Sequence, residues 1–326
     1  MRRREVIGLI GIPTIWPMVT RAQGTTKMAR VAALLSVAPG APTLWNQCLE
    51  RLQLLGWDRG RNLIIEVRYV DTRRDLLAAG AAELVALSPD VIVAANSQTI
   101  EAALAQTSSI PIVMVGASHP VEAGFIKSLA SPGSNVTGVT NQLNDIDFKA
   151  LGLLREAKPG IDRVGVLYTP SNAGSALAVK QLLATPRSAL GLSIIPVPID
   201  RPADIETAFA LIDREGLRGL QVHPTPVIST NRARIAALLI ERRVPTVTAF
   251  NTFVRDGILM SYGPDLVELW RDAASYIDRI LRGARPADLP VQQPTKFLFV
   301  VNLKTAKAIG VDFSPSLLAR ADEVIE

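Results

Sequence analysis

Strand-like and helix-like stretches alternate along the chain, and this alternation limits the fold more than any other feature. Short apolar runs at 30–37, 90–97 and 110–117 read as buried strands, whereas 43–57 and 98–107 repeat apolar residues at helical spacing. Such a series predicts parallel sheets with right-handed crossovers and helices on both faces. The length of 326 residues and the hydrophobic content of 48% suit two units of this kind.

The alternation divides into two series of similar size. A stretch rich in Gly, Ser and Pro, 131–140, separates them. We therefore predict an α/β fold of two doubly wound parallel-sheet lobes with a ligand cleft between them. Ligands of such sheets bind beyond the carboxyl ends of the strands, so the cleft should be lined by residues that follow strands.

Ten residues near predicted strand ends are the candidate ligand-binding residues. Asn and Ser at a helix start lie beside free N–H groups that favour a carboxylate, although the same residue types also serve as ordinary N-caps. Tyr and Phe offer flat apolar walls for a ring, or else pack at a lobe edge. The ten are Ser36, Asn96, Ser97, Gln98, Ser118, His119, Tyr168, Asn172, His223 and Phe250.

His119 is one of only two histidines, and the segment around it, 115–125, runs from a strand end through Pro120 into an expected short helix. We predict that His119 is a cleft residue whose protonated form would favour a ligand carboxylate. The alternative is a cap or a residue that packs at the hinge.

Enzyme motifs are absent from the sequence. There is no Gly-rich nucleotide loop, no Gly-x-Ser-x-Gly elbow and no His-Glu-x-x-His pair. The two histidines fall in different units, and the single cysteine, Cys48, reads as a small buried apolar residue. We expect no catalytic residues, no metal and no cofactor.

Residues 1–22 have the pattern of a signal peptide, with an arginine-rich start, a short apolar run and small residues before Gln23. Arg3 and Arg4 resemble the twin-arginine export pattern, and an ordinary secretory signal is the alternative. Removing this segment lowers the formal net charge from +5 to about +2. The basic balance is therefore no argument for a nucleic-acid partner.

Several stretches resemble the ABC-transporter substrate-binding family of bacterial periplasms, in the group linked to tryptophan or tyrosine uptake. They are "RNLIIEVRY", "LASPGSNVTGVT", "ILMSYGP" and the C-terminal "GARPADLPVQQPTKFLFVVNLKTAKAIGVDFSPSLLARADEVIE". The resemblance covers essentially the whole chain. It implies a type I periplasmic-binding-protein fold, in which two lobes close on a small ligand, and an ABC permease in the inner membrane as partner.

The same resemblance implies three chain crossings between the lobes, near Thr140, at 258–262 and at 297–302. The expected lobes are 23–139 plus 262–290 and 140–261 plus 291–326.

The sequence departs from the family pattern at two strand ends. The run that often reads Gly-Asp-Pro-Val is "SHPV" here, and Ala249 and Thr252 replace two acids of the family around Phe250. A buried ammonium needs a carboxylate or several acceptors. These departures favour a ligand with a carboxylate or a polar ring and no ammonium, such as an aromatic acid.

We interpret the chain as a monomeric periplasmic solute-binding protein of an ABC-type uptake system. A sensory protein of the same fold is the main alternative, and a secreted α/β enzyme is a weaker one. A repressor is disfavoured, because no helix-turn-helix precedes the first strand.

The first testable prediction concerns export. Protein recovered from its host should begin within one or two residues of Gln23, as N-terminal sequencing would show, and an intact Met1 would contradict this. Replacing Arg3 and Arg4 by Lys should block export by the twin-arginine route, whereas unchanged export would assign the general secretory route.

Overall fold

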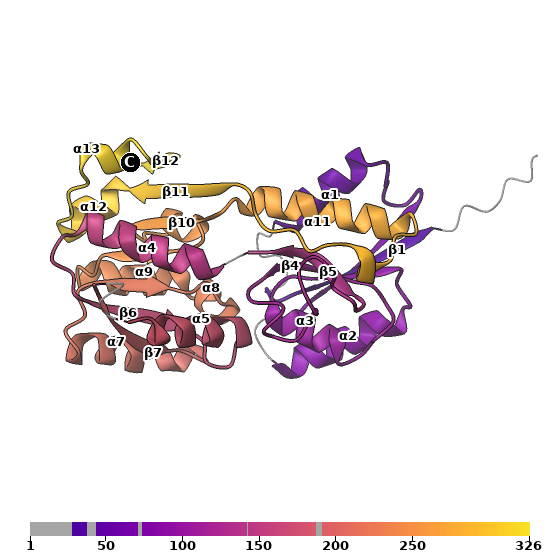
Figure 1. The fold of residues 1–326 in the computed structure, drawn as a ribbon, viewed down its shortest axis with the longest axis horizontal. Helices are drawn as coiled ribbons and strands as arrows, with labels where there is room; N and C mark the ends of the chain where they lie inside the picture. Colours follow the sequence, from indigo (N-terminus) through magenta and orange to yellow (C-terminus); the bar gives the residue numbers. More distant parts are fainter. Residues whose placement is uncertain (1–27, 38–43, 71–73, 142, 187–190) are drawn as a thin grey trace, which may run out of the picture.

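The computed structural model describes residues 28–37, 44–70, 74–141, 143–186 and 191–326. Figure 1 shows two α/β lobes side by side along the long axis, joined by a few extended segments. This confirms the predicted fold class. The expected signal peptide lies outside the described residues. None of the helices in the described part of the chain is long and apolar enough to cross a membrane.

The first lobe contains five parallel strands in the order β2-β1-β3-β4-β5. Its strands are β1 (Ala29–Leu35), β2 (Leu63–Tyr69), β3 (Val91–Ala94), β4 (Ile112–Ala117) and β5 (Val136–Thr140). Its helices are α1 (Trp45–Leu54), α2 (Arg74–Ala86), α3 (Ser97–Leu104) and α11 (Leu266–Leu281).

Helices cover both faces of this sheet, which explains why its central strands are largely apolar, whereas the edge strand β2 carries Glu66 and Arg68. Val31 and Ala33 of β1 pack with α1 and α11 on one face, and Ala32 and Leu34 pack with α2 on the other. Cys48 is fully buried in α1, as expected.

The second lobe contains seven strands in the order β12-β11-β10-β9-β8-β6-β7, of which only the β10–β11 pair is antiparallel. Its strands are β6 (Arg163–Tyr168), β7 (Ser193–Pro198), β8 (Leu220–Val222), β9 (Thr246–Thr248), β10 (Met260–Pro264), β11 (Phe297–Asn302) and β12 (Glu323–Ile325). Its helices are α4 (Leu143–Ala157), α5 (Ala173–Ala184), α7 (Ile205–Arg214), α8 (Pro226–Thr230), α9 (Arg232–Glu241), α10 (Thr252–Arg255), α12 (Leu303–Ile309) and α13 (Pro315–Leu318).

The chain passes between the lobes three times, and two crossings differ from the expected positions. β10 pairs with β9 and β11 in the second sheet, so the second crossing follows Pro264 instead of lying at 258–262. β11 also belongs to the second sheet, and the third crossing precedes Phe297. Gln292 still exchanges backbone hydrogen bonds with Gly138 and Thr140 of the first lobe, each 3.0 Å long. Residues 262–264 therefore lie with the second lobe, and Gln292 lies against the first.

The segment after β4 corrects another expectation. Residues 118–126 form successive turns, not a short helix. His119 and Gly124 adopt positive φ angles of 51° and 77°, which a right-handed helix does not accommodate. Part of the stretch that read as a Gly-, Ser- and Pro-rich connection is the buried strand β5.

Candidate ligand-binding cleft

A cavity of about 360 Å³ lies between the lobes, within the size range of small-molecule sites. The ends of β1, β3 and β4 supply its first-lobe wall, together with Leu269 and Trp270 of α11. The second-lobe wall includes residues that follow β6, β8 and β9, such as Asn172, His223 and Phe250. The cavity thus occupies the place that the fold predicts for a ligand.

The structure brings most of the ten candidate residues to this cavity. Gln98, His119 and Tyr168 are not among its lining residues. Gln98 is the second residue of α3, and Tyr168 packs against the core of the second lobe. Contact with ligand stays a prediction for all ten. Those that line the cavity are Ser36, Asn96, Ser97, Ser118, Asn172, His223 and Phe250.

Two helices begin at the cavity from opposite lobes, and an asparagine caps each of them. Asn96 Oδ1 accepts a 3.1 Å hydrogen bond from Thr99 N at the start of α3. Asn172 Oδ1 accepts a 3.0 Å hydrogen bond from Ser175 N at the start of α5. Both asparagines are N-caps and cavity residues at once, so the two interpretations of these residues are compatible.

Asn96 also has an unusual backbone. Its φ of 127° and ψ of 168° fall in a region that is populated almost only by glycine. Its Nδ2 donates a 3.1 Å hydrogen bond to Ser36 Oγ, which ties the ends of β3 and β1 together. Strained residues of this kind cluster at ligand sites, and Asn96 fits that pattern.

His119 is buried and lies near polar groups of the other lobe. Burial has the largest effect on the pKa of His119 and lowers it. The charges of Glu122 and Asp147 raise this pKa, and His223 lowers it further. A lowered pKa keeps the imidazole neutral near pH 7. This argues against the cationic role expected for His119.

His223 follows β8 of the second lobe and is 3% exposed. Its Nδ1 lies 3.5 Å from Ser175 Oγ, and its Nε2 lies 3.4 Å from Asp147 Oδ1. The same Asp147 oxygen accepts a hydrogen bond from Gln221 Nε2. Asp147 is 3% exposed and is not a lining residue, so it supports the cavity wall from behind.

Among the lining residues that sequence reasoning missed, three carry polar or aromatic side chains that bear on recognition. Asn141 follows β5, a strand that the sequence did not reveal, and its Oδ1 accepts a 3.1 Å hydrogen bond from Ser118 Oγ. Trp270 and Arg232 lie on the helices α11 and α9, where helical periodicity gives no sign of a cleft. The Arg232 guanidinium pairs with Asp256 and donates to Ser229 O at 3.0 Å.

The two lobes touch beside the cavity, where α3 contacts α5. Gly174, in the first turn of α5, lies against the first lobe at this contact. A Cβ atom there would lie 2.9 Å from Ser118 Cβ and 3.2 Å from Ser97 Oγ of the first lobe. Only glycine fits this contact without a shift of the lobes.

Comparison with known proteins decides the family. The family model described as ABC transporter substrate binding protein matches residues 38–325. The chain belongs to this family. The substrate-binding protein is 26% identical to a tyrosine-binding protein of Clostridioides difficile (strain R20291) over 263 residues, which cover 81% of this chain and 75% of the relative.

Solved structures share the type I periplasmic-binding-protein fold. A conserved domain protein from Vibrio cholerae superposes with a TM-score of 0.84 at 25% identity, over 91% of this chain and 100% of that one. An ABC domain in complex with L-Trp from Streptococcus pneumoniae superposes with a TM-score of 0.85 at 23% identity, over 91% of this chain and 99% of that one. A ligand-free, open substrate-binding protein with adhesive properties from Clostridium difficile has a TM-score of 0.66 at 22% identity, over 91% of this chain and 99% of that one.

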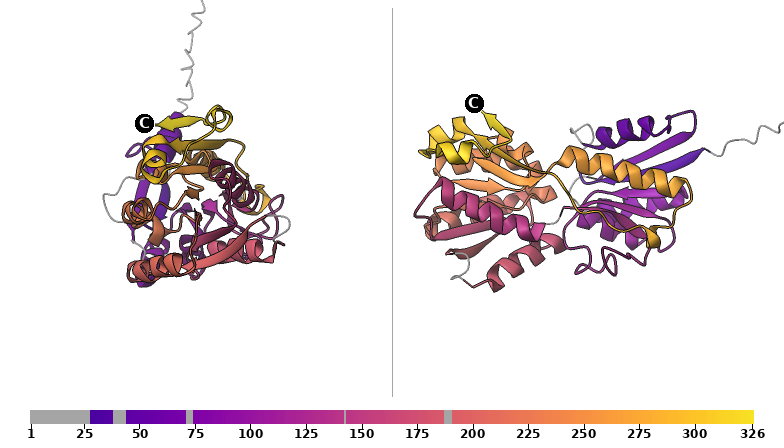
Figure 2. Two further views of the ribbon diagram at one scale, coloured as in Figure 1. Left: turned by 90° about the vertical axis from the view of Figure 1, so that its left-hand side faces the viewer. Right: turned by 45° about the horizontal axis from the view of Figure 1, so that its top comes forward.

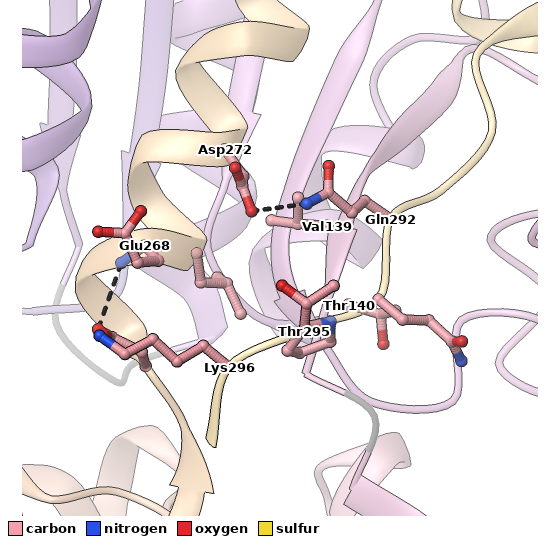
Figure 3. Close-up of a pocket in the computed structure, with 11 residues that line it drawn as sticks. Val139, Thr140, Glu268, Asp272, Gln292, Thr295 and Lys296 are labelled. Atoms are coloured by element: carbon pink, nitrogen blue, oxygen red, sulfur yellow. Dashed lines mark hydrogen bonds and ion pairs between the residues drawn. The ribbon is translucent and has the colours of Figure 1, made fainter. Parts of the chain in front are cut away.

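A second cavity, of about 290 Å³, lies at the hinge of this substrate-binding protein (Figure 3). Asp265 caps α11 through Val267 N at 3.0 Å, and its Oδ2 pairs with Lys296 Nζ at 2.8 Å. Gln292 Nε2 donates a 2.7 Å hydrogen bond to Asp272 Oδ2. These polar contacts fasten the second and third crossings to α11. Among the described residues, no group of His, Cys, Asp or Glu is placed to hold a metal ion.

The second testable prediction concerns Asp272 at this hinge. Burial and the nearby Glu268 raise its pKa, against the opposing effects of Gln292 and Arg51. The folded state therefore binds this proton more tightly than the unfolded state, and stability is lost as pH rises through the folded-state pKa. Asp272→Asn removes the ionisable carboxyl and keeps an acceptor for Gln292. The melting temperature of this variant should therefore exceed that of the wild type at pH 7 and match it near pH 3.

The matched control is Asp288→Asn, which removes the same charge from an exposed carboxylate. Its melting temperature should show no such pH-dependent gain. Equal pH profiles for the two variants would contradict the assignment to Asp272.

Proposed function

We propose that the chain is a periplasmic solute receptor of an ABC-type uptake system. It binds a small polar or aromatic molecule, an aromatic acid or an amino-acid-like compound, in the cavity between its lobes and presents it to a permease. The observation that carries the proposal is the cavity itself, because both lobes line it at the carboxyl ends of their strands. The protein acts as a monomer and carries out no catalysis.

The relatives support a ligand of this size. One is named a tyrosine-binding protein, and one solved structure is described as a complex with L-Trp. The cavity of about 360 Å³ can enclose a molecule with one or two rings. We assign ligand contact to the seven candidate residues that line it.

Hinge closure of the two lobes is the proposed mechanism. The α3–α5 contact beside the cavity supports it, since this contact must open for a ligand to enter or leave on that side. The superpositions are consistent with a closed arrangement here, with TM-scores of 0.85 against the L-Trp complex and 0.66 against the ligand-free, open structure. The residues fastened at the hinge would change little during closure.

A thermal-shift screen of the mature protein against amino acids, aromatic acids and purines tests the proposed function. A true ligand at 100 times its Kd should stabilise the folded state by about 2.7 kcal/mol. A protein that no small molecule stabilises, or one that converts a small molecule to product, would contradict the receptor function.

The next prediction tests closure at Gly174. Gly174→Ala adds a methyl group against Ser118 and Ser97 of the opposite lobe, so the closed state becomes overpacked. An overpacked contact costs about 1–3 kcal/mol, which corresponds to roughly 5- to 150-fold weaker ligand binding. The open protein should stay folded, because alanine is a better helix former than glycine.

Gly152→Ala is the matched control, a glycine of α4 with nothing within 4 Å of an added Cβ. It should bind ligand like the wild type. Unchanged affinity in Gly174→Ala, measured by calorimetry with the screened ligand, would contradict closure through the α3–α5 contact.

A further inference from the structure

Building on the proposed function, we propose that the cleft selects an aromatic carboxylic acid without an ammonium group. The side-chain N–H groups of Asn141, which follows β5, and of Asn172, at the start of α5, recognise the carboxylate. An aromatic amino acid, which differs only by its ammonium, is rejected.

The first argument is the hydrogen bonding of the side-chain amides that line the cavity. The oxygens of Asn96 and Asn172 accept from backbone N–H groups, which can only donate, so the orientations of both amides are fixed. The oxygen of Asn141 accepts from Ser118 Oγ. The amides of Asn96 and Asn172 therefore turn their N–H groups away from the helix starts and toward other partners, and Asn141 does the same with Ser118 as donor.

Two of these amide nitrogens have no acceptor among the described residues. Asn96 Nδ2 is bound to Ser36, whereas those of Asn141 and Asn172 have no protein partner there. Asn141 is 4% exposed and Asn172 is 7% exposed, and both line the cavity. N–H groups without a protein acceptor that face a ligand site are available to an acceptor on the ligand.

A chain of contacts through Ser118 links the segments that carry the two donors. Ser118 is bonded to Asn141, and the same Ser118 lies against Gly174, two residues after Asn172. The start of α5, with its positive dipole end, completes this side of the cavity. An anion placed here would meet donors from both lobes, which couples its recognition to closure.

The charge of the lining is the second, independent argument. Among the described lining residues, none is Asp or Glu, and Arg232 is the one lining residue of the Lys and Arg type. The nearby carboxylates are already engaged, Asp147 with Gln221 and His223, and Asp256 with Arg232. A desolvated ammonium would find no free carboxylate in this lining.

The apolar part of the cavity indicates the rest of the ligand. Trp270 enters the lining from α11 of the first lobe, and Phe250 enters it from the end of β9 in the second. Trp270 is itself held edge-on by Trp45, with ring centroids 6.0 Å apart. Aromatic walls from both lobes suit a flat ring.

Calorimetry with three matched ligand pairs tests the inference. The pairs are 3-phenylpropanoate with L-phenylalanine, 3-(4-hydroxyphenyl)propanoate with L-tyrosine, and indole-3-propanoate with L-tryptophan. In at least one pair the acid should bind about tenfold more tightly than the amino acid, or better, because an uncompensated buried charge is strongly disfavoured.

Asn172→Asp gives the decisive variant. Aspartate caps a helix as well as asparagine, so Ser175 N keeps its acceptor and the fold should persist. The variant loses the Nδ2 donor and adds a negative charge, so acid binding should fall by about tenfold or more and the preference should shift toward the amino acid. Ser314→Asp is the control, because it changes an N-cap of α13, remote from the cleft, in the same way.

Each outcome supports or overturns the inference that the cleft selects an aromatic acid. Acid preference in the wild type that is lost in Asn172→Asp and kept in Ser314→Asp supports the inference. Tighter binding of an amino acid by the wild type overturns it, as does an acid preference that Asn172→Asp leaves unchanged. If none of the six compounds binds, this ligand class is overturned, while the receptor function is judged separately by the wider thermal-shift screen.

Discussion

The hydrogen bonds that join the three chain crossings are the constraint on which the rest of the structure depends. Gln292 bonds through its backbone to Gly138 and Thr140, and Asp265 N donates to Lys296 O at 3.0 Å. Three segments far apart in sequence are thereby held side by side, as the right-hand view of Figure 2 shows. In the proposed hinge closure, the lobes rotate about this edge and so open or shut the cleft.

The cleft combines structural roles and proposed recognition roles in the same side chains. Asn96 and Asn172 use their oxygens to cap α3 and α5, and capping directs their N–H groups toward other partners. Each helix start thus becomes a set of donors whose orientation is fixed before any ligand arrives. Preorganised donors need little further ordering on binding, so more of the interaction energy appears as affinity.

The sequence was sufficient for the fold class, because most central strands of both sheets are buried on two faces and read as apolar runs. It also located the cap residues Asn96 and Asn172, since strand ends and helix starts leave local signals. It could not reveal Asn141 or Trp270, which reach the cavity through a strand hidden in a Gly-rich stretch and through a helix that crosses back to the first lobe. The short helix expected after His119 is wrong because positive φ angles and burial, which make this segment a series of buried turns, come from tertiary context.

The central claim is that the cleft between the lobes, and not the hinge cavity, holds the ligand by its carboxylate. The most direct measurement is a crystal structure of the mature protein with the compound that stabilises it most. The account predicts the ring between Trp270 and Phe250 and a carboxylate oxygen within hydrogen-bond distance of Asn172 Nδ2. A ligand at the hinge cavity, or one in the cleft whose carboxylate meets neither Asn141 nor Asn172, would contradict it.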